Sequence, residues 1–395
     1  MRIGIDACCW SNCRGFGRYT RELVTTLVRQ YPEHEFVLVA DRPTAEQSNF
    51  PPGAAIVPVA TRQQMTHAAS AASSRGVGDL LRLGRAAAAV RADAFLFPAV
   101  YSYYPLLGRT PCLIVFHDAI AEQHPGLIFA GRRARLFWAW KTWLARRQAS
   151  VLATVSQDAR RQVAAAFGYP EEKIRVITEG PGDGIAPLDD SRRVADARRR
   201  YGLPADTPLI LYVGGISPHK NLQGLARALA AMPPAAGPWH LVLVGEYRSD
   251  SFLSCYRELT GLFRELALTD RVSFTGFVPE DDLAALYSAA TMLVLPSFAE
   301  GFGLPVVEAM ACGLPVAASR RGSLPEVLGG AGLLFDPADP AAIAGCVIRL
   351  LSDSSLRVEL RRLGLERAAN YSWRTAARQA MELFEEMAPR ARRTA

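Results

Sequence analysis

Short apolar runs alternate with longer amphipathic stretches along almost the whole chain. The short runs have the length and composition of buried strands, and the stretches between them carry apolar residues at helical spacing. This alternation predicts parallel sheets whose two faces are covered by helices. Because 395 residues exceed what one hydrophobic core usually organises, we expect two doubly wound α/β domains.

The apolar runs divide into two groups. The first half of the chain has seven, at residues 2–7, 36–40, 54–59, 94–97, 112–116, 151–155 and 174–177. The second half has six, at residues 209–213, 241–244, 272–275, 292–295, 315–318 and 333–335. Between them lies a segment, residues 179–184, in which glycine and proline break both periodicities. We therefore predict domains at residues 1–185 and 186–370. Residues 371–395 should form a final helix to about residue 387 and a frayed basic tail.

Composition excludes several classes of protein. Half of the residues are hydrophobic, 21% are charged and the mean hydropathy is +0.07, which is typical of a globular chain and not of a disordered one. The sequence contains no run of about 18 apolar residues, so we expect no membrane-spanning helix. Asp6 lies where a signal peptide would be apolar, and the seven cysteines lack paired spacing. We therefore expect a cytoplasmic protein whose cysteines are reduced thiols.

The net positive charge does not by itself identify a partner, but the positions of the lysines are informative. A net charge of +7 suits an anionic ligand, an anionic membrane or nucleic acid equally well. Only three of the 45 basic residues are lysines, and one of these, Lys220, follows the glycine pair Gly214-Gly215 between a strand and a helix. A compact ammonium in such a loop suits a diphosphate, although the Walker spacing is missing. The alternative is an ordinary solvated lysine.

Two glycines, Gly15 and Gly17, follow the first strand and open a helix. Glycine there lets backbone amides approach an anion at the helix N-terminus. The pair also matches part of a dinucleotide-binding fingerprint, with Asp41 after the next strand, but Thr20 occupies the third glycine position. Three interpretations of Gly15 and Gly17 remain open: they belong to an anion site, they belong to an NAD site, which the partial match supports only weakly, or they only shape a turn.

The fifth strand ends at His117 and Asp118. An imidazole and a carboxylate thus lie at the carboxyl edge of a parallel sheet, where ligands bind in such folds. His117 could orient or neutralise a reacting group. The alternative is a histidine at the edge of the core that is hydrogen-bonded to a neighbouring carbonyl.

The most specific segment is residues 296–315, in which Glu300 and Glu308 bracket a junction between a loop and a helix. Pro305 suits the first turn of that helix, and Gly313 suits its end. A glutamate can accept both hydrogen bonds of a vicinal diol. Three amides at the junction would face an anionic or hydroxyl-rich ligand, those of Phe302, Gly303 and Leu304.

In this segment the run Glu-Gly-Phe-Gly-Leu-Pro-x-x-Glu-Ala-Met-Ala-Cys-Gly-x-Pro-Val closely resembles that of the retaining GT-B glycosyltransferases of family 4, also called group 1. The resemblance covers nearly the whole chain, because other family positions follow in order: Gly15, Gly17, His117, Lys220, Glu300, Glu308, Leu324-Pro-Glu-Val327 and Tyr371-Ser-Trp373. It implies an α/β GT-B fold of two facing Rossmann-like domains, with the ligand cleft between them and a C-terminal helix crossing back.

The resemblance also implies roles for individual residues. Lys220 would neutralise the donor diphosphate, Glu308 would hold the ribose hydroxyls and Glu300 would lie near the transferred sugar and phosphate. His117 would face the sugar near the reacting centre. Backbone groups would complete the binding site for the nucleotide sugar, those of Gly15, Gly17, Gly215, Phe302, Gly303 and Leu304.

The implied reaction is retaining, metal-independent transfer of a hexose, with a slight preference for GDP-mannose as donor, to a glycan or lipid-linked saccharide in polysaccharide or glycolipid biosynthesis. No cofactor is implied, and the sequence has no Asp-x-Asp motif for a metal-bound diphosphate. Ile216 and His219 occupy positions where many relatives carry an arginine, so Arg18 and Arg320 are candidates for the second phosphate cation.

Two alternatives share this fold. One is a GT-B relative with other chemistry, such as a phosphorylase or a nucleotide-sugar epimerase. The other is a non-catalytic protein that binds a nucleotide sugar. Nucleic-acid binding would explain the basic charge but none of the motifs, so no nucleic-acid partner is expected.

The segment from Arg132 to Arg147 combines six cations with four aromatic residues, Phe137, Trp138, Trp140 and Trp143. Basic aromatic helices can lie on anionic membranes, and lipid-linked acceptors are common in the resembled family. Peripheral contact with the inner face of a membrane is therefore one expectation. The alternative is that the tryptophans pack on the sheet while the arginines are solvated.

Overall fold

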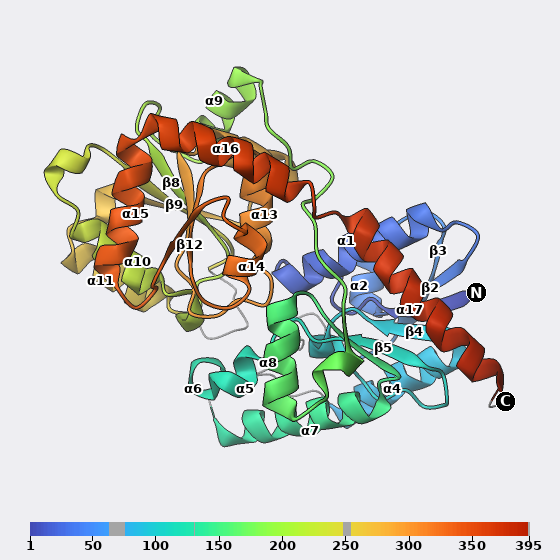
Figure 1. The fold of residues 1–395 in the computed structure, drawn as a ribbon. Helices are drawn as coiled ribbons and strands as arrows, with labels where there is room; N and C mark the ends of the chain where they lie inside the picture. The colour runs from blue at the N-terminus through green and yellow to red at the C-terminus, as the bar shows by residue number, and fades with distance from the viewer. Residues whose placement is uncertain (63–75, 130, 248–253, 394–395) are drawn as a thin grey trace. The chain divides into compact units, whose positions relative to one another are not determined.

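The computed structural model describes residues 1–62, 76–129, 131–247 and 254–393, with side chains to residue 388 in the last segment (Figure 1). The chain forms two compact units, Met1–Glu179 with Trp373–Ala395, and Gly180–Ser372. The division at Glu179 falls inside the glycine- and proline-rich segment, earlier than the expected boundary at residue 185.

The first unit is built on a seven-stranded parallel sheet with the order β3-β2-β1-β4-β5-β6-β7. Its strands are β1 (Arg2–Asp6), β2 (Glu35–Asp41), β3 (Ala54–Val59), β4 (Ala94–Phe97), β5 (Cys112–Val115), β6 (Val151–Thr154) and β7 (Ile174–Val176). The order reverses between β1 and β4, and the loops at such a point diverge to leave room for a ligand.

The sheet of the first unit is covered by helices on both faces (Figure 1). The helices are α1 (Gly15–Gln30), α2 (Arg42–Gln47), α4 (Val77–Ala89), α5 (Ile120–Gln123), α6 (Pro125–Ile128), α7 (Arg132–Gln148), α8 (Gln157–Phe167) and α17 (Trp373–Arg393), with 3₁₀ turns η1 (Val100–Ser102) and η2 (Glu171–Lys173). The last helix, α17, packs against α1, and its buried residues include the small side chains of Ala376, Ala377 and Ala380. It continues to Arg393, beyond the expected end at about residue 387.

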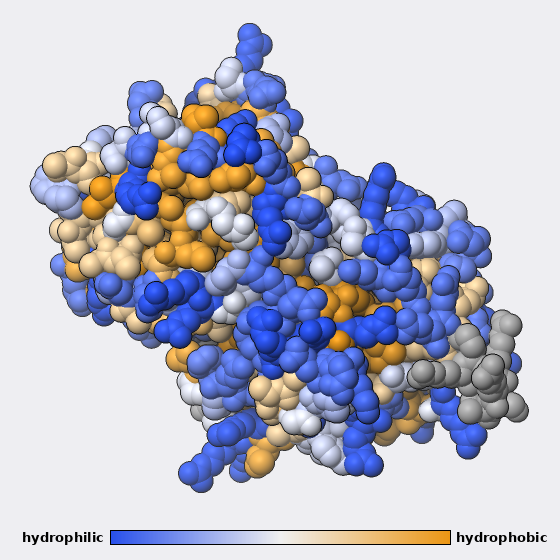
Figure 2. Space-filling model, viewed as in Figure 1, coloured by the Kyte–Doolittle hydropathy of each residue, from blue (hydrophilic) through white to orange (hydrophobic). Residues whose placement is uncertain are grey.

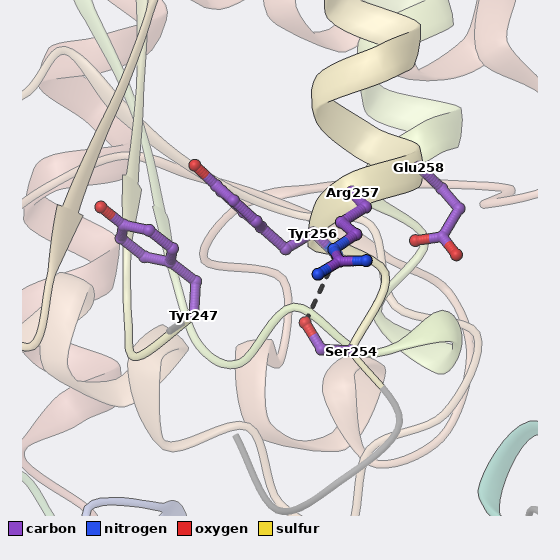
Figure 3. Close-up of a pocket in the computed structure, with 5 residues that line it drawn as sticks. All are labelled: Tyr247, Ser254, Tyr256, Arg257 and Glu258. Carbon is purple, nitrogen blue, oxygen red and sulfur yellow. Dashed lines mark hydrogen bonds between the residues drawn. The ribbon is translucent and has the colours of Figure 1, made fainter. Parts of the chain in front are cut away.

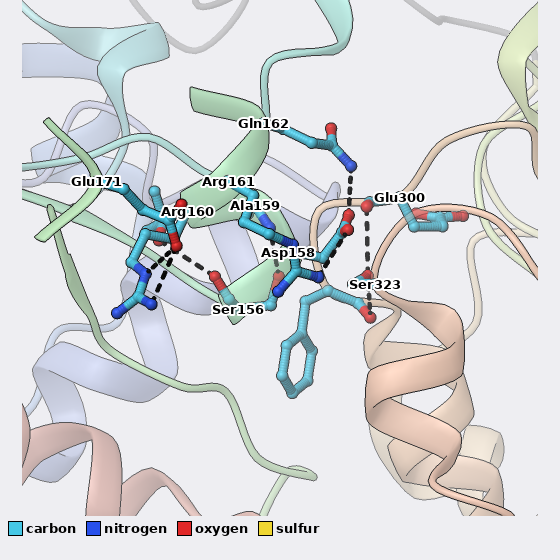
Figure 4. Close-up of polar contacts among 11 residues, drawn as sticks. Ser156, Asp158, Ala159, Arg160, Arg161, Gln162, Glu171, Glu300 and Ser323 are labelled. Carbon is cyan, nitrogen blue, oxygen red and sulfur yellow. Dashed lines mark hydrogen bonds and ion pairs between the residues drawn. The ribbon is translucent and has the colours of Figure 1, made fainter. Parts of the chain in front are cut away.

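Local signals explain the start of α8. Ser156 is its N-cap, and the Oγ atom accepts a hydrogen bond from the amide of Ala159 at 2.9 Å (Figure 4). The partly buried Arg160 of this helix pairs with Glu171 of η2 at 3.1 Å. Gly168 then ends the helix in the left-handed conformation.

The second unit contains a six-stranded parallel sheet with the order β10-β9-β8-β11-β12-β13. Its strands are β8 (Leu209–Val213), β9 (His240–Val244), β10 (Val272–Gly276), β11 (Met292–Leu295), β12 (Val316–Ser319) and β13 (Leu333–Phe335). The order reverses between β8 and β11. Every predicted strand of both units is present, with ends that differ from the prediction by one residue at most.

Helices surround this second sheet as well (Figure 1). They are α9 (Ser191–Arg200), α10 (Leu222–Ala230), α11 (Tyr256–Glu265), α12 (Glu280–Ala289), α13 (Leu304–Ala311), α14 (Leu324–Leu328), α15 (Pro340–Ser352) and α16 (Ser354–Ala368), with 3₁₀ turns η3 (Pro218–Lys220), η4 (Pro234–Ala236) and η5 (Thr269–Arg271). Both units are thus Rossmann-like, as the alternating pattern predicted.

Hydrophilic side chains cover much of the face shown in Figure 2, and hydrophobic surface is confined to separate patches. Among the described helices, none combines the length and the hydropathy needed to cross a bilayer.

Candidate active site

A lysine and a glutamate from two loops of the second unit form an ion pair. Lys220 ends η3, after β8, and its ammonium donates to both carboxylate oxygens of Glu300, at 2.7 and 2.8 Å. The exposed fractions of the two side chains are 19% and 10%. The pair joins the loops that follow β8 and β11 at the carboxyl edge of the sheet, where ligands bind in this kind of fold.

The loop that carries Glu300 is fixed by two serines. Ser297 Oγ donates to Glu300 Oε1 at 2.6 Å. Ser323 Oγ donates to the carbonyl oxygen of Phe302 at 2.7 Å and lies 3.2 Å from the carbonyl oxygen of Glu300 (Figure 4). At Gly322, where φ is +61°, a Cβ atom would lie 2.8 Å from that same Glu300 oxygen. Only glycine therefore lets the two loops approach so closely.

Glu308 lies one turn inside α13, the helix that begins after this loop. Gly303 precedes α13 with φ of +96°, and a Cβ atom there would lie 2.6 Å from the Leu324 side chain. Glycine at the N-cap has no side chain that could cap the helix amides. The Glu308 side chain is almost fully buried, and its Oε2 accepts a hydrogen bond from the Tyr287 hydroxyl at 2.8 Å. A diol would thus meet a carboxylate that already accepts one hydrogen bond.

The glycines after β8 allow two loops to touch backbone to backbone. A Cβ atom on Gly245, after β9, would lie 2.1 Å from the carbonyl oxygen of Gly214. The carbonyl oxygen of Gly215 accepts a hydrogen bond from the Tyr212 hydroxyl at 2.7 Å. These contacts hold the loop that contains Gly214, Gly215 and Lys220 close to the edge of the sheet.

Asn221 links the Lys220 loop to the loops after β11 and β13. Its φ of +54° is left-handed, a conformation that asparagine tolerates better than most residues. Its amide nitrogen Nδ2 donates to the carbonyl oxygens of Pro296, at 3.1 Å, and Pro337, at 2.7 Å. Three loops are therefore joined by one buried side chain.

A pocket of about 400 Å³ opens at the same edge of the second sheet. Its lining residues are Tyr247, Ser254, Tyr256, Arg257 and Glu258 (Figure 3). The rings of Tyr247 and Tyr256 are stacked, with their centroids 4.6 Å apart. The amide of Cys255 donates to the carbonyl oxygen of Ile216 at 2.9 Å, so the pocket adjoins the Lys220 loop. No sequence motif indicated these residues.

In the first unit, His117 follows β5 and is 8% exposed. Its Nε2 donates to the carbonyl oxygen of Pro98 at 2.9 Å, and its Nδ1 lies 3.7 Å from Glu179 Oε1. Pro98 follows β4 and Glu179 follows β7, so residues after three strands meet at one edge of the sheet. The sequence-based alternative, a histidine bonded to a neighbouring carbonyl, describes this ring correctly, and its role toward a sugar stays a prediction.

Two buried residues, Tyr19 and Glu179, lie beside His117. Tyr19 of α1 packs edge-on against the imidazole, with centroids 4.7 Å apart. Burial, and then the negative charge of Glu179, raise the pKa of Tyr19 well above its usual value, so its hydroxyl stays protonated. Glu179 itself is 4% exposed. Sequence analysis missed Glu179, because a carboxylate within a turn-rich segment carries no local sign of burial.

Gly15 and Gly17 differ in what the fold requires of them. A Cβ atom on Gly17 would lie 2.2 Å from the carbonyl oxygen of Asn12, whereas one on Gly15 would meet no described atom within 4 Å. Asp41, the acidic residue of the dinucleotide alternative, is fully buried and accepts a hydrogen bond from Thr44 at 2.9 Å. This burial argues against a ribose ligand at Asp41 and hence against NAD binding.

Two family models match the chain. The model for Glycosyltransferase Family 4 matches residues 14–180, and the model for Glycosyl transferases group 1 matches residues 194–367. All the candidate site residues, from Gly15 to Glu308, lie inside the matched segments. The chain belongs to the GT-B glycosyltransferases of family 4, group 1.

Curated relatives of this glycosyltransferase match over part of their length. The O-antigen chain mannosyltransferase B of Escherichia coli is 33% identical over 237 residues, which are 60% of this chain and 61% of that protein. The D-inositol 3-phosphate glycosyltransferase of Acidothermus cellulolyticus is 37% identical over 228 residues, 56% of this chain and 50% of that protein. The match thus spans half to three fifths of the relatives.

Solved structures match this glycosyltransferase over nearly all of the chain. The sucrose-phosphate synthase of Thermosynechococcus elongatus has a TM-score of 0.76 and 22% identity, and the match covers 98% of this chain and 99% of that one. The Anabaena protein HepE, in complex with UDP and glucose, has a TM-score of 0.74 and 21% identity, with 98% and 100% covered. These likenesses establish the GT-B fold of two Rossmann-like domains.

Arg18 and Arg320, the candidates for the second phosphate cation, lie in different units of this glycosyltransferase. Arg320 pairs with Asp336 at 2.5 Å on an exposed part of the second unit. Arg18 lies on the first turn of α1 and is partly buried. Neither arrangement by itself assigns a phosphate contact, so this role stays a prediction.

The basic and aromatic side chains of helix α7 are buried at some positions and exposed at others. Trp138 is 5% exposed, and Lys141, also buried, donates to the carbonyl oxygen of Tyr101 at 3.0 Å. Trp140 and Trp143 are 49% and 46% exposed. The sequence-based alternative, in which the tryptophans pack on the sheet while the arginines are solvated, thus holds for Trp138 and for the arginines near the helix start but not for the half-exposed Trp140 and Trp143. Lys141 is not a surface cation.

Proposed function

We propose that this glycosyltransferase transfers a hexose from a nucleoside diphosphate sugar to a hydroxyl of a glycan or lipid-linked saccharide, with retention of configuration. In this reaction the bond between the sugar C1 and the diphosphate oxygen breaks, and a bond between C1 and the acceptor oxygen forms. The acceptor proton passes to the leaving phosphate on the same face of the sugar. No protein nucleophile is required.

The observation that carries this proposal is the bidentate pair between Lys220 and Glu300 at the edge of the second sheet. Departure of a nucleoside diphosphate builds negative charge, and a lysine held in a nearly dry loop can stabilise it. When a diphosphate draws the ammonium away, Ser297 still holds Glu300 in place. The pocket at Tyr247 and Tyr256 adds room for a ligand beside the same loop.

Mannose is the first sugar to test, because the relative that is 33% identical carries the name of an O-antigen chain mannosyltransferase. The complexes of HepE contain UDP, so the test set includes UDP-sugars beside GDP-sugars. We further propose that transfer needs no divalent metal, since the sequence has no Asp-x-Asp motif to bind one at a diphosphate.

The proposal is tested with purified protein, each nucleotide sugar and a panel of saccharide acceptors, with and without chelator. The expected result is a new glycoside whose anomeric configuration, read by proton NMR, equals that of the donor sugar. Lys220→Ala is expected to lower kcat by at least about 100-fold, and Arg362→Ala, which removes an exposed pair with Glu366, is the control. An inverted product, activity only with added metal, or a K220A variant as active as the control would contradict the corresponding part of the proposal.

We also propose that α7 brings the enzyme to an anionic membrane that carries its acceptor. Leu136, Trp140 and Trp143 are exposed on this helix, and Arg132, Arg133 and Arg135 are exposed near its start. Half-exposed tryptophans beside arginines suit the boundary between lipid headgroups and acyl chains. The membrane would thereby concentrate a lipid-linked acceptor near the first unit.

Sedimentation with vesicles tests this second proposal. We expect binding to phosphatidylglycerol-containing vesicles, little binding to pure phosphatidylcholine vesicles, and loss of binding in the triple variant with glutamate at Arg132, Arg133 and Arg135. Arg161→Glu on α8, where Arg161 pairs with Asp158 at 3.2 Å, controls for charge. Equal sedimentation of the triple variant and the control would refute membrane contact through α7.

A further inference from the structure

We propose that Ser297 is a positioning residue for Glu300, holding the carboxylate by its Oε1 atom so that Oε2 accepts a hydrogen bond from a hydroxyl of the transferred hexose. This inference rests on the proposed function, because the donor supplies both the diphosphate that attracts Lys220 and the sugar that meets Glu300. Ser297 lies in the segment 296–315, but neither its spacing nor the family resemblance assigned it a role. All the contacts involved lie within the second unit.

The two carboxylate oxygens of Glu300 differ in the hydrogen bonds that they accept. Among the described residues, Oε1 accepts from the Ser297 hydroxyl at 2.6 Å and from the Lys220 ammonium at 2.7 Å, whereas Oε2 accepts from the ammonium alone, at 2.8 Å. One carboxylate oxygen accepts about two hydrogen bonds. Oε1 is therefore fully engaged, and Oε2 has room for one more donor.

Burial separates the two partners of Glu300. Ser297 is fully buried, so its hydroxyl does not reach a ligand. The side chains of Lys220 and Glu300 are 19% and 10% exposed, which leaves both within reach of one. Ser297 thus acts on a ligand only through Glu300.

The residues on both sides of Ser297 are bonded to the residues on both sides of Lys220. Each of these two contacts joins a donor nitrogen to a carbonyl oxygen, and they are Phe298 N to His219 O at 2.8 Å and Asn221 Nδ2 to Pro296 O at 3.1 Å. The position of the Ser297 hydroxyl is therefore set by the two loops. The Lys220 ammonium, by contrast, lies at the end of a flexible four-carbon side chain.

A bound donor would act differently on these two partners. Its diphosphate competes with Glu300 for the ammonium, because phosphate oxygens are strong acceptors from a cation. The buried serine keeps its hydrogen bond to Oε1, and Oε2, released by Lys220, faces the sugar. Without Ser297, Glu300 would turn about its terminal torsion, which has only broad preferences of its own. Loss of the hydroxyl should then lower turnover without changing the affinity for the nucleoside diphosphate.

The kinetic test is Ser297→Ala, assayed with the nucleotide sugar that the wild-type protein transfers. We expect kcat to fall about tenfold. The Kd for GDP or UDP, whichever the reaction releases, should stay within about twofold of the wild-type value by isothermal titration calorimetry. Ser297→Cys, which fills similar space with a weaker donor, should give an intermediate kcat. Ser102→Ala is the matched control, because Ser102 is also fully buried and its hydroxyl donates to the Ala99 carbonyl in the first unit, at 3.1 Å.

A second comparison asks whether Ser297 acts through Glu300. In a Glu300→Ala background, Ser297→Ala should cause no further loss of kcat, and an independent loss there would overturn the proposal. A loss of nucleotide affinity as large as the loss of turnover would overturn it as well, because that is the result of a merely structural role.

These outcomes differ from a failure of the proposed function. A wild-type protein that transfers no hexose from any nucleotide sugar would overturn the proposed function, and this inference with it. A wild-type protein that transfers hexose, together with a Ser297→Ala variant as active as Ser102→Ala, would overturn the positioning role of Ser297 alone.

Discussion

At the scale of single residues, this molecule depends on close approaches that tolerate no substitution. A Cβ atom on Gly17 would collide with the backbone oxygen of Asn12 in the loop before α1, and one on Gly322 would collide with the backbone oxygen of Glu300 in the loop after β11. Lys220 and Glu300 lie 80 positions apart in the chain and meet through two loops held by serine and asparagine side chains. Local chemistry at the site is therefore sensitive to changes of one methyl group.

Gly17→Ala and Gly15→Ala are expected to differ sharply. The added methyl at position 17 would lie 2.2 Å from the carbonyl oxygen of Asn12, so the loop before α1 must move, and we expect a loss of about 2 kcal/mol in the free energy of unfolding. The methyl at position 15 meets open space, so we expect a change below about 0.5 kcal/mol. Urea denaturation of both variants measures this difference, and equal values would contradict the packing role of Gly17.

Lys220→Ala is expected to reduce stability as well as turnover. It leaves the Glu300 carboxylate, whose side chain is 10% exposed, without its cation, and a hydrogen bond to a charged group contributes about 2 kcal/mol. Arg320→Ala breaks an exposed pair with Asp336 in the same unit, which should cost less than about 1 kcal/mol. If chemical denaturation gave the two variants the same free energy of unfolding, the ion pair between Lys220 and Glu300 would add no more to stability than the exposed pair of Arg320 does.

At the scale of secondary-structure elements, buried polar contacts join short helices that have little core of their own. The helix α5 has only four residues, and it is tied to α7 by a hydrogen bond of 2.6 Å from Trp138 Nε1 to Glu122 Oε1. Burial raises the pKa of Glu122 from 4.5 to about 7, and the hydrogen bond from Trp138 opposes part of this shift. The contact between the two helices is therefore sensitive to pH.

We expect the free energy of unfolding to fall as pH rises from about 4.5 to 7. The folded protein binds the Glu122 proton more tightly than the unfolded chain does, so this contribution is complete below pH 4.5 and is lost as pH passes 7. Its size is up to about 3 kcal/mol. Urea denaturation at pH 5 and pH 7.5 measures the loss, and Glu122→Gln should flatten the pH dependence. If the free energy of unfolding of Glu122→Gln depended on pH as strongly as that of the wild type, groups other than Glu122 would cause the dependence.

At the scale of the whole molecule, the first unit is assembled from two distant parts of the chain. Residues 1–179 supply its sheet, and α17 supplies a helix that packs on α1. The α17 side chains of Trp373, Met381 and Phe384 are buried, and the Trp373 ring contacts Tyr19 of α1 edge-on. The second unit is continuous in sequence, so only the first depends on the C-terminal segment.

Phe384→Ala is expected to destabilise the first unit by about 4 kcal/mol, because it removes a fully buried aromatic side chain and leaves a cavity. Five of the six tryptophans lie in this unit, and Trp239 alone lies in the other, so tryptophan fluorescence reports mainly on the first unit. The control is Val358→Ala at a 70% exposed position on α16. A fluorescence transition at the same urea concentration in both variants would contradict this dependence on α17.

The sequence by itself determined the strands, most of the helices, the two-domain plan and the family. These follow from local patterns: apolar periodicity, glycine and proline at turns, and the paired glutamates Glu300 and Glu308 on one short segment. Tertiary structure decided the partners of the site residues. Lys220 faces Glu300, His117 lies between Pro98 and Glu179, and Glu308 accepts from Tyr287. Such contacts join loops that are distant in sequence, and only the order of strands in each sheet determines which loops meet.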